Sequence, residues 1–200
     1  MVQCTPKESF GPCTKRNKRI HHTWYFVPRT WYKKMDGQQI QQLLQTKLLR
    51  EYSWKPGTEA LQPQLRVPAQ QIRDISRLLL SHPDLYFDYL TCVTAMDNGP
   101  AAGTMEVIYH LYSIPHNHAF ILNVEVPRGD GKEVLPEVPT VSDIWRSANW
   151  HEREAYDMYG IIFKGHPDLR RILLPADWEG WPLRKDYQEQ EYYRGIQVKY

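Results

Sequence analysis

Two glutamates lie two positions apart near residue 150 and form a candidate acid–base pair. Hydrolases that cleave glycosidic bonds use two carboxylates that flank the bond to be broken. Glu152 and Glu154 occur in a segment with a helical pattern, and residues two apart on a helix point roughly 200° away from each other. These two carboxylates cannot flank one bond, so the sequence argues against a hydrolase built on this pair.

Cysteine and histidine are the other side chains that could bind a metal or a cluster. Cys4, Cys13 and Cys92 are too few for a four-iron cluster, and none forms the close pair of a structural zinc site. They are also too scattered for a disulfide framework, which favours a reducing compartment. His21 and His22 follow the first two cysteines, but the gaps between these four residues are not typical of a zinc finger.

Three further histidines, His110, His116 and His118, have no cysteine or carboxylate at a ligand-like spacing. We expect them to occupy surface and core positions. No glycine-rich dinucleotide loop follows a predicted strand. The sequence therefore predicts a chain without a metal, a cluster or another cofactor of its own.

The positive charge is concentrated in residues 1–36, which hold eight Lys or Arg against two acidic residues, whereas the remainder holds 17 against 21. The run from Lys15 to Arg19 can attract the phosphates of RNA or of anionic lipids, or it can form a solvated arm. Aromatic residues follow at once, between Trp24 and Tyr32, so part of this arm is expected to dock on protein. The sequence leaves these alternatives open.

No stretch of the chain approaches the roughly 18 consecutive apolar residues of a membrane span. The amino terminus is polar and basic, unlike a secretory signal. We therefore expect the chain to stay in the cytoplasm.

The first two thirds of the chain predict two helices and a sheet. Apolar residues at helical spacing over 37–49 follow Asp36, a typical cap residue, and a second helix begins at Pro68 and ends before Pro83. A strand ends at Val67. Three strands rich in β-branched and aromatic residues follow the second helix: Tyr86–Ala95, Met105–Ile114 and Ala119–Val126. We expect them to be antiparallel, with helices on one face and a partner on the other.

The segment from Ser142 to Gly160 predicts two short helices. The first covers 142–148 and the second 150–159, with Asn149 as its cap, Glu152 in a capping box and Gly160 as its left-handed stop. Arg153 and Asp157 are one turn apart and are expected to pair. Glu154 then has to find its partner elsewhere.

The last 40 residues alternate large apolar groups with charged ones, and proline and glycine interrupt them repeatedly. Only residues 161–163 resemble a strand. An irregular segment of this length is uncommon inside a compact domain unless it has a function, and Trp, Tyr and Arg are typical of protein interfaces. We predict a tail that binds a partner protein; the alternative is a tail folded onto its own sheet.

Three motifs carry a resemblance to a known family: WHEREAYDMYG at 150–160, GHPDLRRIL at 165–173 and DWEGWPLRKDY at 177–187. Together they resemble the signature of the 30-kilodalton subunit family of respiratory complex I, the proton-pumping NADH:quinone oxidoreductase. The resemblance is dense over 142–187, and residues 37–126 resemble the family only in the order of their elements.

This resemblance implies a non-catalytic structural and assembly subunit of the peripheral arm, one member of a hetero-oligomer. It would bind the neighbouring subunit that bears the quinone-site residues, which we call the quinone-site subunit. Iron–sulfur subunits would lie beside it, and it would touch the membrane arm only indirectly. NADH, FMN, iron–sulfur clusters and quinone would be bound by partner subunits, at the cytoplasmic face of the bacterial plasma membrane.

Two alternatives remain open. One is the equivalent subunit of a photosynthetic or hydrogenase-type relative of the complex. The other is an RNA-binding module, although no nucleic acid is expected.

The predicted fold class is α+β: a ferredoxin-like antiparallel sheet covered by two helices, then a short helical junction and a long irregular carboxy-terminal tail. The predicted regions are a basic aromatic arm (1–36), the α+β domain (37–141), the junction with the family signature (142–160) and a partner-binding tail (161–200). The predicted interface residues, taken from the signature, are Glu152, Arg153, Glu154, Asp157, Gly160, His166, Arg170, Arg171, Trp178, Trp181, Arg184, Lys185 and Asp186.

Overall fold

The structure is a computed structural model that describes residues 34–48 and 62–198. The predictions made for residues 1–33, including those for Cys4, Cys13, His21 and His22, lie outside the described residues.

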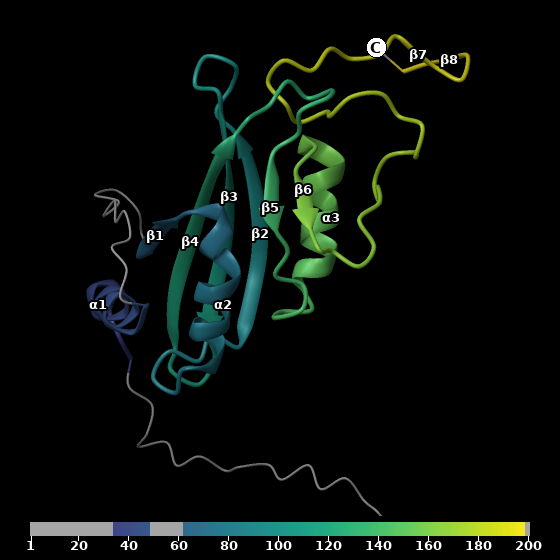
Figure 1. Cartoon of the computed structure of the whole chain (residues 1–200). Helices are drawn as coiled ribbons and strands as arrows, with labels where there is room; N and C mark the ends of the chain where they lie inside the picture. Colours follow the sequence, from purple (N-terminus) through teal and green to yellow (C-terminus); the bar gives the residue numbers. More distant parts are fainter. Residues whose placement is uncertain (1–33, 49–61, 199–200) are drawn as a thin grey trace, which may run out of the picture. The chain divides into compact units, whose positions relative to one another are not determined.

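A four-stranded sheet forms the centre of the described chain (Figure 1). Its strands are β1 (Gln64–Val67), β2 (Tyr89–Asp97), β3 (Thr104–Ser113) and β4 (His118–Pro127), in the order β1-β4-β3-β2. The three predicted strands are confirmed as β2, β3 and β4, which pair antiparallel. The short β1 pairs parallel with β4, so the prediction of an antiparallel sheet is wrong at this edge, and the ferredoxin-like arrangement is not confirmed.

Burial alternates along the strands as the pleat requires. In β3 every second side chain from Met105 to Ser113 is buried, and the intervening ones are partly exposed. The buried side chains of β3 and β4 meet Ile75 and Leu79 of helix α2 (Ile72–Ser81) in one hydrophobic core. A single 3-10 turn, Ala69–Gln71, leads into α2 directly after Pro68.

The first helix, α1 (Gly37–Leu48), begins where the sequence predicts. The Asp36 Oδ1 atom accepts the Gln39 N–H at 2.8 Å, and the Gln39 side-chain oxygen accepts the Asp36 N–H at 3.2 Å. This reciprocal pair confirms Asp36 as the cap. Ile40 and Leu44 of α1 are buried in the core of the sheet.

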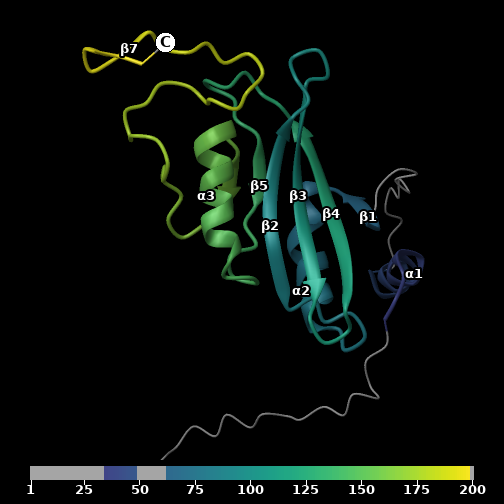
Figure 2. The same cartoon turned by 180° about the vertical axis from the view of Figure 1, so that it is seen from behind.

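Helix α2 covers one face of the sheet: it lies in front of the strands in Figure 1 and behind them in Figure 2. In the described part of the chain, no helix lies over the opposite face, which Figure 2 presents to the viewer. Ile108 and Ile121 are among its half-buried side chains. The occupant that we predicted for this face stays a prediction.

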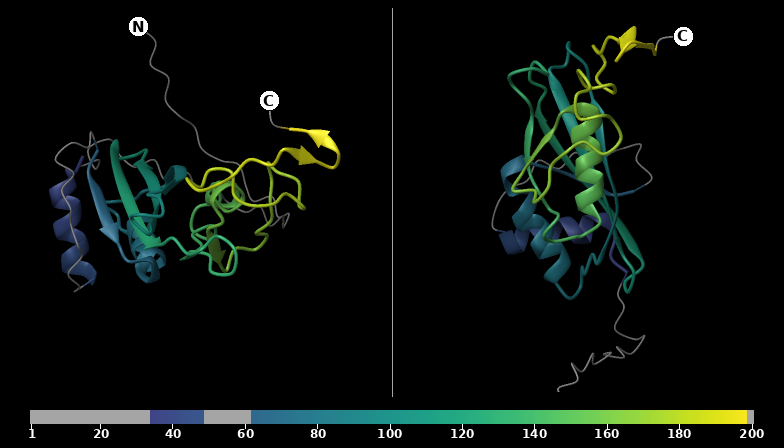
Figure 3. Two further views of the ribbon diagram at one scale, coloured as in Figure 1. Left: turned by 90° about the horizontal axis from the view of Figure 1, so that it is seen from above. Right: turned by 90° about the vertical axis from the view of Figure 1, so that its right-hand side faces the viewer.

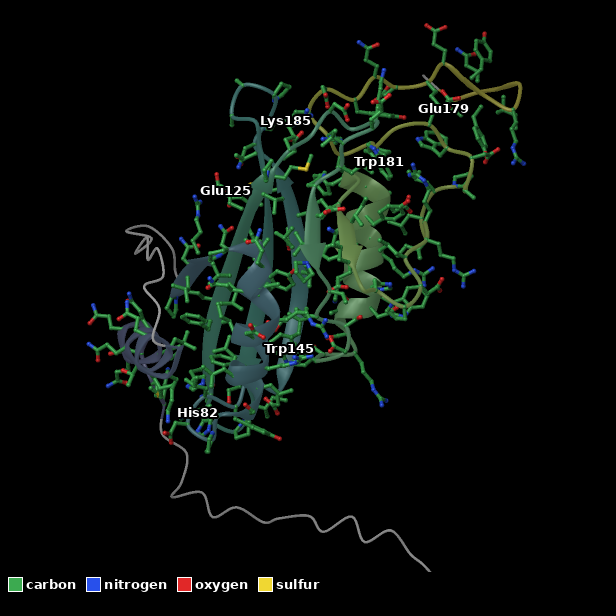
Figure 4. The ribbon with its side chains drawn as sticks, in the orientation of Figure 1. His82, Glu125, Trp145, Glu179, Trp181 and Lys185 are labelled. Carbon is green, nitrogen blue, oxygen red and sulfur yellow. The ribbon has the colours of Figure 1, made fainter. Side chains whose placement is uncertain are left out.

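Helix α3 (Ala148–Tyr159) lies beside β2, at the β2 edge of the four-stranded sheet (Figure 3). Trp145 joins the two, because its indole N–H donates to the Phe87 carbonyl at 2.8 Å (Figure 4). A helix packed in this position protects β2 from pairing with another strand. The predicted helix over 142–148 is wrong, because this stretch forms turns closed by bonds to the Val141 and Trp145 carbonyls.

A second, two-stranded sheet lies next to α3. Its strands are β5 (Glu137–Pro139) and β6 (Ile162–Lys164), which pair in parallel. The predicted short strand at 161–163 is thus confirmed as β6, one residue further along. After β6 the only regular element described before residue 199 is a hairpin of two short strands, β7 (Tyr192–Tyr193) and β8 (Ile196–Gln197).

Candidate functional site

The family signature maps to α3 and to residues 165–187, which we call the carboxy-terminal segment. This segment runs along α3 and then over the end of the sheet (Figures 1 and 2). Trp181 and Lys185 in Figure 4 mark the part that passes over the end of α3 and reaches the strands. Three buried carboxylates, of Glu152, Asp157 and Asp97, hold the site together.

Glu152 lies on α3 with its side chain completely buried. Its carboxylate accepts hydrogen bonds from the Thr140 hydroxyl and, at 2.8 Å, from the Val141 N–H. Burial raises the pKa of Glu152 to about 7, although these two hydrogen bonds oppose the shift. The predicted capping box is therefore wrong: the helix begins at Ala148, before Asn149, and Glu152 binds the strand connection instead of the helix end.

His166 packs against Glu152 from the start of the carboxy-terminal segment. Its Nε2 atom lies 3.1 Å from the Asn149 carbonyl and 4.0 Å from Glu152 Oε2, and neither side chain is exposed. Its Nδ1 atom accepts the Asp168 N–H at 3.1 Å. Burial lowers the pKa of His166, despite the bond to Asn149. The imidazole thus fixes the chain that leaves β6 against the first turn of α3.

Asp157 is the main attachment point between α3 and the carboxy-terminal segment. Its Oδ2 atom accepts three successive backbone N–H groups, those of Ile172 at 3.0 Å, Leu173 at 2.7 Å and Leu174 at 3.0 Å. Its Oδ1 atom accepts Arg171 Nη1 at 2.9 Å. Burial raises the pKa of Asp157, but these donors outweigh it and hold the pKa below its usual value.

The predicted pairing of Arg153 with Asp157 is wrong. Arg153 Nε instead donates to the Arg170 carbonyl at 3.3 Å, and its guanidinium stacks 4.9 Å from the centre of the Trp150 ring. Four donors from the carboxy-terminal segment already surround the Asp157 carboxylate, so it has no need of a partner on its own helix.

Arg171 extends this attachment to Trp181. Its guanidinium donates to the Trp178 and Gly180 carbonyls, at 3.2 and 3.0 Å, and stacks 4.4 Å from the centre of the Trp181 indole. Trp181 also donates its own N–H to the Gly131 carbonyl at 2.9 Å. The aromatic ring is thereby held between α3 and the turn after β4.

Gly160 has two functions at this place. Its φ of 74° ends α3 in the left-handed conformation, as predicted. A Cβ atom at this position would lie 2.6 Å from the Trp181 ring. Only glycine therefore both ends the helix and leaves room for the indole.

A second attachment lies at the end of β2. The Asp97 carboxylate accepts Arg128 Nε at 2.8 Å and the backbone N–H groups of Gly99 and Lys185, at 2.9 and 2.8 Å. Burial raises the pKa of Asp97, but these donors outweigh burial and lower the pKa to about 2. Arg128 also pairs with Asp186.

Arg184 completes this attachment by donating to the Arg128 carbonyl at 2.6 Å. We did not predict a role for Asp97 or Arg128. Their only signal in the sequence is their position at the ends of two predicted strands, with the predicted Arg128–Gly131 turn, whose Gly129 and Gly131 have positive φ.

The structure divides the predicted interface residues into two groups. Arg171, Trp181, Arg184 and Asp186 bind groups of their own chain, where we expected contacts with a neighbouring protein. Trp178 also bonds within the segment, to the Tyr187 hydroxyl at 3.1 Å. The second group is exposed and includes Glu154, Arg170, which pairs with Asp168, and the side chain of Lys185.

Neither a metal cluster nor a membrane span is found in the part of the chain that the structure describes. No three His, Cys, Asp or Glu side chains at 34–48 or 62–198 are grouped so that they could hold a metal ion. His116 and His118 lie 2.7 and 2.9 Å from the carbonyls of Pro83 and Leu85. None of the described helices is both long and apolar enough to cross a bilayer.

Because the buried carboxylates are engaged in holding the chain together, they are not arranged as an acid and a base around a substrate. What the site presents outward is mostly apolar. Trp150, Leu173 and Leu183 are 63%, 62% and 53% exposed. Large exposed apolar side chains around a rigid junction are typical of a protein-binding surface.

Comparison with known proteins identifies the same region. Residues 65–193 match the model of a family described as the respiratory-chain NADH dehydrogenase 30 Kd subunit. An NADH-quinone oxidoreductase subunit of Chloroherpeton thalassium is 50% identical over 117 residues, which are 58% of this chain and 46% of the relative. The corresponding subunit of Chlorobium phaeobacteroides is 46% identical over 128 residues, covering 64% and 74% of the two chains.

The chain thus spans about half the length of the Chloroherpeton relative. Among solved structures, one chain of the membrane-bound sulfane sulfur reductase, an archaeal respiratory membrane complex, has a similar fold. Its TM-score is 0.59 at 26% sequence identity, and the alignment covers 74% of this chain and 83% of the other.

Proposed function

The chain belongs to the 30-kilodalton subunit family of respiratory-chain NADH dehydrogenase, and from this premise we propose that it is a non-catalytic structural and assembly subunit of NADH:quinone oxidoreductase. In this proposal it lies in the peripheral arm at the cytoplasmic face of the bacterial plasma membrane. It binds the quinone-site subunit near the place where quinone is reduced.

The observation that carries the proposal is the use of charge at the junction. Asp157 and Asp97 direct their carboxylates at donors of the carboxy-terminal segment, so the acids of the site serve the fold and not a reaction. The segment is held in one conformation while Leu173 and Leu183 remain exposed. A surface fixed before binding loses less conformational entropy when a partner docks.

Electron transfer from NADH to quinone, coupled to proton translocation, then takes place on other subunits. NADH, FMN, iron–sulfur clusters and quinone are held by those partners. The contribution of this chain is positional: a rigid junction keeps the neighbouring subunit in the geometry that its own site requires.

A tagged full chain, expressed in its own cells and purified from gently solubilised membranes, tests the proposal. We expect the quinone-site subunit, iron–sulfur proteins and integral antiporter-like subunits to copurify. Recovery of the chain alone, or with a bound prosthetic group of its own, would contradict the proposal.

The electron donor of the parent complex needs a separate assay, because the structural relative belongs to a sulfane sulfur reductase. Membranes from cells that lack this chain should lose NADH-driven quinone reduction, and the tagged chain should restore it. Unchanged NADH oxidation with loss of another electron-transfer activity would assign the chain to a related complex.

A further inference from the structure

A groove of about 340 Å³ lies between β2 and α3, outside the two attachments described above. Its apolar lining comes from three separate parts of the chain: Val93 and Ala95 of β2, Ala155 and Met158 of α3, and Leu183 of the carboxy-terminal segment. It is therefore a composite surface, present only when the segment is docked.

The α3 wall of the groove is one face of the helix. His151, Glu154, Ala155 and Met158 follow the i, i+3, i+4, i+7 spacing that places residues on the same side. Glu152 and Asp157, which hold the fold, are not on this face. The signature therefore encodes two functions on one helix, an internal one and an outward one.

The segment's wall of the groove is fixed by the backbone. The Leu183 N–H donates to the Met158 carbonyl at 3.1 Å, and the next residue, Arg184, is anchored to the Arg128 carbonyl. Leu183 nevertheless exposes 53% of its surface. Met158, opposite it, has the flexible side chain that adapts to an incoming apolar group.

The charge of the groove comes from Glu154. Glu152 and Asp157 accept several hydrogen bonds each, but Glu154 is exposed and makes no hydrogen bond or ion pair with any residue at 34–48 or 62–198. Burial raises the pKa of Tyr159 in the same wall, and the nearby carboxylates of Asp97 and Glu154 raise it further. The wall thus presents a negative potential beside an apolar floor.

We propose that this groove docks an apolar segment of a neighbouring subunit that carries a lysine or arginine, and that the cation pairs with Glu154. The apolar floor matches the hydrophobic part of such a segment, and the unpaired carboxylate at the rim complements its charge. This inference rests on the proposed function, since it assigns the surface through which the subunit binds its neighbour.

Reversal of the charge of Glu154 tests the pairing in the assembled complex. Glu154→Lys should lower the amount of copurified neighbour at least about tenfold, because two cations would then meet across the interface. Glu133→Lys is the matched control: it makes the same charge change at an exposed turn outside the groove and should leave copurification unchanged. Equal recovery for both variants overturns the pairing.

Cross-linking identifies the occupant directly. A photo-reactive benzoylphenylalanine in place of the exposed Leu183 should attach to a peptide of another subunit that contains lysine or arginine within a few residues. Replacement of that basic residue with glutamate should then restore the copurification of Glu154→Lys. Attachment to a second copy of this chain, to its own residues alone or to nothing would overturn the inference.

These results separate the two proposals. If the unmodified tagged chain copurifies with no respiratory subunits, the proposed function fails. If it copurifies with them but the groove forms no cross-link to a neighbour, only the assignment of the groove fails.

Discussion

The sheet and the α3 junction hold their shape by different means. In the sheet, buried side chains such as Tyr109, Phe120 and Leu122 are packed by the hydrophobic effect, which has no preferred direction. At the junction, Asp157 and Asp97 each accept four hydrogen bonds from fixed donors. The sheet therefore tolerates different apolar residues, whereas the junction requires particular side chains at particular places.

This difference accounts for where the family signature lies. A packed core accepts changes that conserve volume at a cost below about 1.5 kcal/mol. A buried carboxylate that satisfies several donors has no such substitute, because its removal leaves each of them unpaired. The motifs at 150–160, 165–173 and 177–187 supply most of these carboxylates and their partners.

The largest effect is expected at Asp157. Asp157→Ala leaves the Arg171 guanidinium and three backbone N–H groups without their acceptor, so the free energy of unfolding should fall by about 3–5 kcal/mol. Urea denaturation of the full chain measures it. Asp177→Ala, which removes the exposed pair with Arg194, should cost less than about 1 kcal/mol. Similar costs for both would erase the contrast between buried and exposed carboxylates.

A pH dependence of opposite sign to the usual carboxylate is expected from Glu152. Its pKa is about 7 in the folded chain against 4.5 for an ordinary glutamate, so the folded chain binds more protons between these values. Its contribution to stability should fall as pH rises from about 4.5 to about 7 and stay low above that.

Glu152→Gln should remove this slope, and above pH 7 the variant should gain on the order of 3 kcal/mol relative to the wild type. His166 acts in the opposite direction because its pKa is lowered, but it is present in both proteins and cancels when the curves are subtracted. Thermal unfolding between pH 4.5 and pH 8 provides the data. Parallel curves would mean that Glu152 titrates normally.

Gly160→Ala should have an intermediate effect. Alanine is strained by about 1–3 kcal/mol at the positive φ of this position, and its Cβ would collide with the Trp181 ring. We expect lower stability together with a change in tryptophan fluorescence. Gly195→Ala is the control for φ alone, since it has a φ of 78° and no atom within 4 Å of the new Cβ. Equal losses would mean that contact with Trp181 contributes nothing.

The smallest effect on stability is expected at Trp178, which is only partly buried and donates to one hydroxyl. Trp178→Ala should cost about 1 kcal/mol in the purified chain, yet it should lower assembly of the complex and hence quinone reductase activity. Native electrophoresis distinguishes the cases. Normal assembly with lost turnover would indicate a direct chemical role.

The elements with local signals were predictable from the sequence. Asp36 and Gln39 cap α1 within one turn, Gly160 ends α3 by its own conformation, and the three long strands follow from alternation and composition. Short elements were not: β5 has three residues and ends in proline, so it offers almost no pattern.

The charged residues of the junction were assigned to the wrong partners because local rules compete with distant contacts. Glu152 fits a capping box, but Thr140 lies 12 residues earlier in the chain and binds it. Arg153 and Asp157 have the spacing of a helical ion pair, but Asp157 binds N–H groups 15–17 residues away. Asp97 and Lys185 are 88 residues apart. No local pattern encodes such pairs.

Buried carboxylates, and not apolar packing, are expected to hold the carboxy-terminal segment on α3. Hydrogen exchange of the Ile172, Leu173 and Leu174 amides in the full chain tests this expectation most directly. We expect exchange slowed at least about a hundredfold relative to an unprotected amide, and loss of that protection in Asp157→Ala while the β3 amides stay protected. Rapid exchange of the three amides in the wild type, or unchanged protection in the variant, would contradict it.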